Sequence, residues 1–132
     1  MSEIQFYGEV THIKRGEQDA RPIFTKGARI RGLAFPVDQA GRSIMTGGTI
    51  EFKASINGHD WFTLNDYAGD PYRLPIRASQ RVIPPPGSLE TAPAYMPIQN
   101  PGLFEGMQMI ILVSNRPEDE ERLITVYREM TN

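Results

Sequence analysis

The chain has 132 residues, the length of one average domain. It contains no cysteine, which excludes disulfides, thiolate zinc sites and a cysteine nucleophile. The formal net charge of −2 supplies no broad basic field for nucleic acid, and no apolar run approaches the roughly 18 residues that a membrane helix needs. We therefore expect neither nucleic acid nor a membrane as a partner.

Apolar residues in most of the chain alternate with polar ones or form short runs between turn residues, which is typical of β-strands. The clearest alternation begins at Thr49, where every second residue to Ile56 is apolar. This pattern predicts an antiparallel strand with one packed face and one wet face. No segment has helical periodicity longer than two turns. In the first two thirds of the chain, strands are predicted over residues 4–10, 23–25, 28–35, 49–56, 61–64 and 72–77.

Two further features organise the second half. Asn57-Gly58 lies between two β-like runs and predicts a two-residue hairpin turn of type I′. Residues 107–114 are apolar on both faces, which predicts a central strand buried between layers or covered by a partner subunit. The acidic run 118–121 is expected to be a solvated hairpin tip before a last strand over 123–130.

Proline is concentrated in one stretch. Residues 71–101 hold eight of the 11 prolines, and proline is confined to edge strands and loops because it donates no backbone hydrogen bond. We predict a Pro-rich surface excursion over 82–101 and a possible N-terminal arm over 1–21. The fold predicted for residues 1–132 is all-β: one antiparallel β-sandwich or jelly roll of about eight strands.

The chain offers little for catalysis. No phosphate-binding loop or nucleophile elbow is present. His59 lies beside Asp60, but no serine accompanies the pair at a recognisable spacing. Asp60, Asp66 and Asp70 have the oxygens that calcium needs, yet aspartates in such loops more often form turns. We expect no catalytic residue, no metal and no cofactor.

Arginine outnumbers lysine by eleven to three, and its planar guanidinium suits protein interfaces as well as an ordinary solvated surface. Stiff extended segments lose less entropy when they are ordered on a partner. The candidate partner-binding residues are two arginines of the arm, three arginines that precede the excursion, and five residues of the excursion itself: Arg15, Arg21, Arg73, Arg77, Arg81, Pro84, Pro85, Pro86, Tyr95 and Met96.

Three aromatic residues near the hairpin, Trp61, Tyr67 and Tyr72, give a second hypothesis. Aromatic side chains grouped in this way resemble a platform on which sugar rings stack. Aromatic residues on strands also pack in cores, so the two interpretations stay open.

From about residue 28 onward, the order of motifs resembles a group of β-sandwich virion proteins of tailed bacteriophages and gene transfer agents. In that group a strand ends in Ser before Asp/Asn-Gly, an aromatic residue and L-x-D-x-x-G follow, and a Phe-x-Gly turn leads to an apolar strand ending in Ser. The matching residues are Ile50 to Gly58, Trp61, Leu64, Asp66, Gly69, Pro101 to Gly106, Ile110 to Ser114, and Ile124 to Arg128.

The resemblance implies a structural protein of the virion: a capsid decoration or cement protein, a head-spike or head-fibre base, or a tail accessory subunit. Its partners would be the major capsid protein or fibre and spike subunits, and we expect a homo-oligomer, with a trimer favoured. The Pro-rich stretch 84–101 and the acidic connection 117–120 depart from the family pattern. The hairpin is also similar to discoidin-type, galactose-binding-like sandwiches, which implies a carbohydrate-binding module as the alternative.

Overall fold

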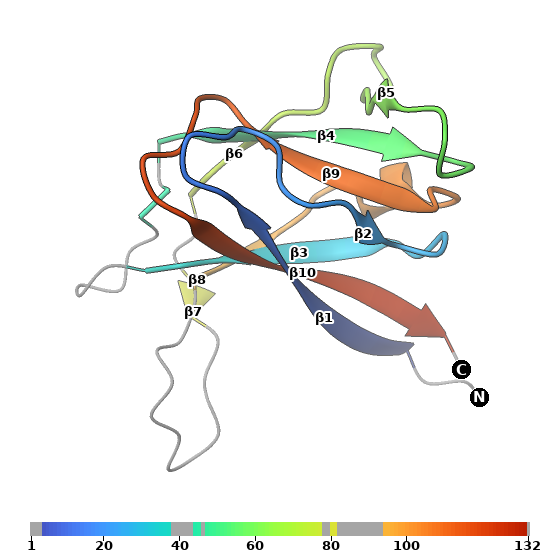
Figure 1. The fold of residues 1–132 in the computed structure, drawn as a ribbon. Coiled ribbons are helices and arrows are strands. Elements are labelled where there is room, and N and C mark those ends of the chain that lie inside the picture. The colour runs from blue at the N-terminus through green and yellow to red at the C-terminus, as the bar shows by residue number, and fades with distance from the viewer. Residues whose placement is uncertain (1–3, 38–43, 46, 78–79, 82–93, 132) are drawn as a thin grey trace.

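The computed structural model describes residues 4–37, 44–45, 47–77, 80–81 and 94–131. These residues form an all-β sandwich of two antiparallel sheets, as predicted (Figure 1). Within them, no helix is long and apolar enough to cross a membrane. The elements are β1 (Ile4–Ile13), β2 (Ile23–Phe24), β3 (Ile30–Phe35), β4 (Thr49–Ser55), β5 (Phe62–Thr63), β6 (Leu74–Pro75), β7 (Gln80–Arg81), β8 (Ala94–Pro97), the 3-10 turn η1 (Pro101–Phe104), β9 (Met109–Ser114) and β10 (Arg122–Thr131).

The strands pair in a nested order. The first sheet runs β1-β10-β3-β8-β7 and the second runs β2-β9-β4-β5, with β6 also paired to β4. The first strand therefore pairs with the last, β2 with β9, β3 with β8, and β4 with β5. Such nesting arises when one long antiparallel ribbon wraps around a barrel axis, which is the topology of a jelly roll.

The core lies between the two sheets, and strand periodicity builds it. On β4, Ile50, Phe52 and Ala54 are buried while the residues between them are partly exposed, as the alternation predicts. On the neighbouring β9, Ile110 and Leu112 are buried in the same cluster. Both strands thus contribute one face to a single continuous core.

The outer face of β9 corrects part of one prediction. The strand is central in its sheet, between β2 and β4, as its apolar character indicates. Met109, Ile111 and Val113 on its outer face are only half-buried. Their exposure shows that β9 is enclosed on one side by the core and is not buried between two layers.

The β4–β5 hairpin forms, but without the predicted two-residue turn. The last residues paired between the two strands are Ala54 and Phe62, and residues 56–61 make a longer loop between β4 and β5. Asn57 folds this loop, because its Oδ1 accepts hydrogen bonds from the backbone N–H groups of His59 and Asp60 at 2.8 and 2.9 Å. Gly58 has φ of 83°, but Asn57 does not adopt the positive φ that a type I′ turn requires.

The segment expected to be an N-terminal arm is part of the sandwich. Residues 4–13 pair with β10 in register along the whole of β1. The chain then crosses to the second sheet, where Ala20 N–H donates to Leu112 O and Ser114 N–H donates to Gln18 O, both at 2.8 Å. A β-like sequence with a complementary last strand satisfies its backbone in the sheet, so residues 4–20 do not extend from the body.

The Pro-rich excursion is also partly a strand. Residues 82–93, with Pro84, Pro85 and Pro86, lie outside the described residues. Residues 94–97 form β8 between β3 and β7, and Ala94, Met96 and Ile98 are buried. Only one proline, Pro97, lies within β8, at its last residue, where the ladder can end. This portion therefore belongs to the first sheet and is not a surface excursion.

Candidate functional site

Residues 72–77 place two of the predicted arginines on one exposed face. Burial alternates strictly along this segment, with Tyr72, Leu74 and Ile76 buried and the residues between them exposed. On an extended strand, residues four apart share a face, just as they nearly do on a helix. The spacing of Arg73 and Arg77 therefore presents both side chains to solvent.

These arginines border a groove of about 370 Å³ between β6 of the second sheet and β8 of the first. The backbone N–H of Arg77 lies 3.4 Å from the Sδ of Met96 and joins the two walls. Buried side chains form the floor and exposed ones the rim. The lining residues are Tyr72, Arg73, Leu74, Pro75, Arg77, Met96, Pro97 and Gln99.

The two rim arginines differ in whether a described carboxylate pairs with them. Arg73 donates from Nε to Glu51 Oε1 at 2.8 Å, and this hydrogen bond raises the pKa of the exposed guanidinium. Arg77 forms no ion pair within the described part of the chain. A carboxylate of a bound segment can therefore meet Arg77 without displacing a partner from the described residues, and guanidinium binds carboxylate in a planar, bidentate manner.

The remaining candidate partner residues do not join this groove. Arg15 and Arg21 are exposed in the loop between β1 and β2. Arg81 lies in β7, and its side chain is outside the described atoms. Tyr95 is half-buried on the outer face of the first sheet, where its hydroxyl lies 3.3 Å from Arg31 O.

Met96, another candidate partner-binding residue, is only 7% exposed. Its side chain belongs to the core cluster and reaches the groove only as part of the floor. β8 turns Met96 toward the core, so only the part of its side chain in the groove floor can meet a bound segment.

The predicted sugar platform is not assembled as a group. Tyr72 is buried and contacts Phe52 and Phe104, with ring centroids 6.0 and 6.2 Å away, so it is a core residue. Trp61 is 36% exposed at the β4–β5 loop and Tyr67 is 82% exposed in the following turn. Only these two aromatic side chains of the three remain accessible to a ligand.

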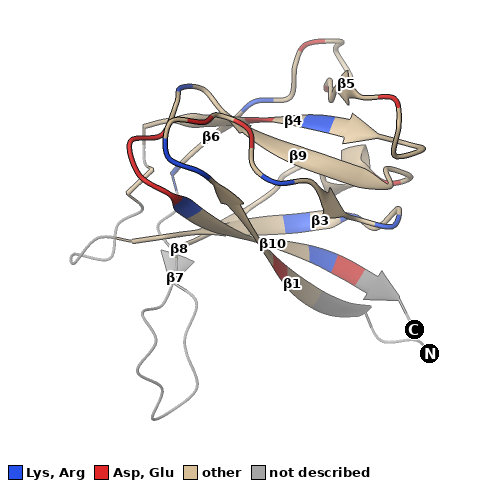
Figure 2. Ribbon diagram, in the orientation of Figure 1, with Lys and Arg blue, Asp and Glu red and all other residues tan. Residues whose placement is uncertain are grey.

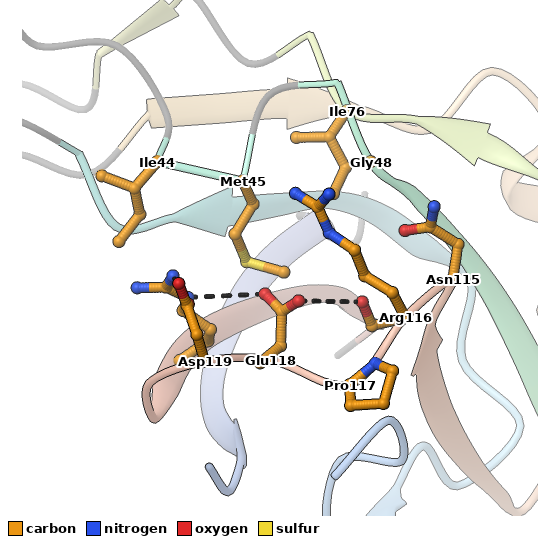
Figure 3. Close-up of a pocket in the computed structure, with 11 residues that line it drawn as sticks. Ile44, Met45, Gly48, Ile76, Asn115, Arg116, Pro117, Glu118 and Asp119 are labelled. Carbon is orange, nitrogen blue, oxygen red and sulfur yellow. Dashed lines mark hydrogen bonds and ion pairs between the residues drawn. The ribbon is translucent and has the colours of Figure 1, made fainter. Parts of the chain in front are cut away.

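A second, polar cavity of about 340 Å³ lies where the β9–β10 turn meets the segment before β4 (Figure 3). The apolar side chains of Ile44, Met45 and Ile76 stand on one side of it, and the turn residues stand on the other. At its wall, Glu118 is only 8% exposed. It accepts a hydrogen bond from Ser114 Oγ at 3.2 Å and one from Arg122 Nε at 3.4 Å.

The predicted solvated acidic tip is therefore wrong for its first residue. Glu118 is held inside because Arg122, four residues later, turns back to it, and the same guanidinium also reaches Asp119 at 2.8 Å. The backbone of Glu118 exchanges hydrogen bonds with Gly16 and Glu17. Figure 2 shows the acidic turn beside the β1–β2 loop. This network ties two loops together and leaves no free carboxylate at position 118.

Of the aspartates predicted to form turns, Asp66 folds its loop with side-chain hydrogen bonds to the backbone, and Asp60 bonds to the side chain of Asn57. Asp66 Oδ1 accepts from the backbone N–H groups of Ala68 and Asp70 at 2.9 and 3.0 Å. Asp60 Oδ2 accepts from Asn57 Nδ2 at 2.8 Å. Among the described residues, no group of three or more histidine or acidic side chains is placed to hold a metal ion.

The chain was compared with protein-family models, curated proteins and solved structures, and none of them matches it. The groove between β6 and β8 is apolar, and at its rim Arg73 is paired with Glu51 while Arg77 has no ion pair among the described residues.

Proposed function

We propose that this chain is a structural protein of a tailed-phage or gene-transfer-agent virion, without catalytic activity. In this proposal it decorates or cements the capsid, or forms the base of a head spike or fibre. Two observations support the proposal. The motif order resembles such proteins, and the jelly-roll topology is one that viral capsid and lectin domains use. Because one fold carries many functions, the site must supply the specific argument.

The groove between β6 and β8 is the observation that carries the proposal. Its floor of Tyr72, Leu74 and Met96 accepts apolar side chains, while the guanidinium of Arg77 offers a charge-assisted contact. A groove of this shape, apolar below and basic at the rim, fits an extended acidic segment of a neighbouring virion protein. We propose that the major capsid protein or a fibre or spike subunit supplies that segment.

The test is co-sedimentation of the purified chain with particles of the phage or gene transfer agent that encodes it. We expect Arg77→Glu to weaken binding by about tenfold or more, because a hydrogen bond to a charged group contributes roughly 1.5–3 kcal/mol. Lys26→Glu makes the same charge reversal in the β2–β3 turn, at the other end of the sandwich from β6 (Figure 1). This control variant should bind like the unmodified chain.

Two results contradict the proposal. One is a chain that never co-sediments with the particles. The other is equal loss of binding in both variants, which would show that net charge and not the groove decides. The melting temperature of each variant confirms that both remain folded.

Exposed Trp61 and Tyr67 favour one alternative, a carbohydrate-binding module that contacts host glycans. Exposed aromatic rings in neighbouring loops present flat apolar faces of the kind on which sugars stack. A glycan array tests this function, and Trp61→Ala should abolish any signal. An empty array counts against it, and Tyr72→Phe is a matched control because Tyr72 is buried.

A further inference from the structure

Strand β1 forms one edge of the first sheet, where β10 is its only neighbouring strand among the described residues. It is bonded to β10 along all ten of its residues without a register shift. Figure 1 shows β1 and β10 running together toward the two chain termini. On its other side, the only described residues that β1 meets are 20 and 21, through the bridge between Ile13 and Ala20 and a hydrogen bond from Arg21 N–H to His12 O.

That hydrogen bond shows which backbone groups face the open edge. In a β-strand, the N–H and C=O of one residue point to the same side, and successive residues alternate between sides. Because His12 O points away from β10, the even-numbered residues of β1 point the same way. Ile4, Phe6, Gly8 and Val10 thus turn their backbone groups outward, and no backbone hydrogen bond within the described ranges satisfies them.

The open part of β1 lacks the features that protect free edges. Proteins prevent edge-to-edge pairing with lysine, proline, bulges or very short edge strands. Residues 4–10 contain no proline and no lysine, and Glu9 is their only charge. On the outer face of this ribbon, Val10 is 60% exposed and Leu123 of β10 is 54% exposed. This edge is uncovered by the part of the chain that the structure describes, and an open strand with apolar neighbours is a template for another strand.

We propose that β1 pairs antiparallel with β1 of a second copy of this chain, around a two-fold axis at Tyr7. This register sets Gly8 opposite the second copy's Phe6, so the outward-facing backbone groups of both strands meet. Glu9 then lies opposite the second copy's Gln5, and no like charges face each other, which would destabilise the pair.

The surroundings of Tyr7 favour a second copy over an unrelated strand. The ring is 48% exposed, and the guanidinium carbon of Arg128 lies 4.9 Å from its centroid. In the two-fold register, Tyr7 stands beside the second copy's Tyr7, with a guanidinium beyond each ring. Such a row joins an aromatic cross-strand pair with two cation–π contacts. This symmetry gives a dimer in place of the trimer favoured from the sequence.

Light scattering on the full-length chain after size exclusion tests the proposal. We expect twice the 14.9 kDa of one chain. Val10→Pro removes an outward N–H and leaves the β10 ladder intact, so it should give monomers. Val10→Thr keeps that N–H and a β-branched side chain, so it should remain dimeric. A chain that is monomeric at every concentration, or Val10→Pro that stays dimeric, overturns the proposal.

Residue-resolved amide exchange supplies a second readout that needs no substitution. In the dimer, the outward amides of Phe6, Gly8 and Val10 should exchange at least about tenfold more slowly than after dilution to monomer. The amides of Tyr7 and Glu9 bond to β10 in both states and should not change. A dimer without this alternation uses another surface and contradicts the proposal. Neither measurement involves virion particles, so the result is independent of the proposed function.

Discussion

Two groups of aromatic side chains lie in different places in the sandwich, one in the core between the sheets and one on the outer face of the first sheet. Phe52, Tyr72 and Phe104 meet in the core, and the rings of Phe52 and Phe104 contact edge to face with centroids 4.9 Å apart. Tyr95 and Tyr127 meet on the outer face of the first sheet, with centroids 5.8 Å apart at an interplanar angle of 70°.

The two groups do different work. The buried rings fill the space between the sheets with apolar volume that no backbone supplies. The outer rings cover backbone where side chains are missing, because a Cβ built on Gly32 would overlap the Tyr95 ring. Pairing of this kind, in which an aromatic ring covers a glycine of the adjacent strand, offsets the weak packing of glycine in a sheet. Similar aromatic residues thus form a core in one place and a surface cover in the other.

The largest effect is expected in the core. Phe104→Ala should lower the free energy of unfolding by about 3–5 kcal/mol, because it leaves a cavity beside Phe52 and Tyr72. Urea denaturation measures this loss. Tyr67→Ala is the control at an 82% exposed ring and should change stability by less than about 0.5 kcal/mol. Equal losses in the two variants would show that the buried rings are not packed as described.

On the outer face, the second largest loss of stability is expected where a side chain is added at Gly32, beneath the Tyr95 ring. Gly32→Ala should cost about 1–3 kcal/mol, because the new methyl group displaces the Tyr95 ring. The double variant with Gly32→Ala and Tyr95→Ala should lose less stability than the sum of the losses in the two single variants. Strict additivity in this double-mutant cycle would mean that the two residues do not touch.

A buried tyrosine makes stability fall at high pH. Burial raises the pKa of Tyr72, and a smaller opposing effect comes from its hydrogen bond with the backbone of Asn100. The neutral Tyr72 hydroxyl therefore contributes its full stability below about pH 10, the pKa of tyrosine in the unfolded chain. This contribution is lost as the pH rises through the higher pKa of Tyr72 in the folded chain. Tyr72→Phe should remove part of this alkaline loss in denaturation curves recorded from about pH 8 to 11. An unchanged alkaline slope would contradict the buried placement of the hydroxyl.

The smallest effect is expected at the groove rim. Arg73→Ala should leave the urea midpoint unchanged, because exposed ion pairs such as Arg73–Glu51 contribute little to folding. If the midpoint falls as far as in a core variant, the rim is structural and is not an available binding surface. Co-sedimentation of Arg73→Ala with the particles is measured separately from its urea midpoint.

Much of the sandwich could be predicted because alternation along a strand is a local signal. The buried face of β4 and the central place of β9 both follow from the period of their apolar residues. The pairing of β1 with β10 joins residues at the two ends of the chain, and no local pattern encodes that contact. A strand-like segment at a terminus was therefore interpreted as an arm.

The candidate site was only partly accessible from the sequence. Arg73 and Arg77 were identified, and the alternation from 72 to 77 contained the signal that Tyr72 points inward with Leu74. The burial of Glu118 had no such signal, because turns have no periodicity, and only the later position of Arg122 hints at an ion pair. Which face a side chain occupies and which residue it pairs with depend on distant parts of the fold, and the local sequence does not predict them.

An electron cryomicroscopy map of particles saturated with the chain tests the binding role most directly. We expect ordered sandwich density on the particle, with the groove between β6 and β8 occupied by an extended segment of a neighbouring virion protein and Arg77 against its carboxylates. Particles without added density, or a bound chain whose groove faces solvent, would contradict the proposed function.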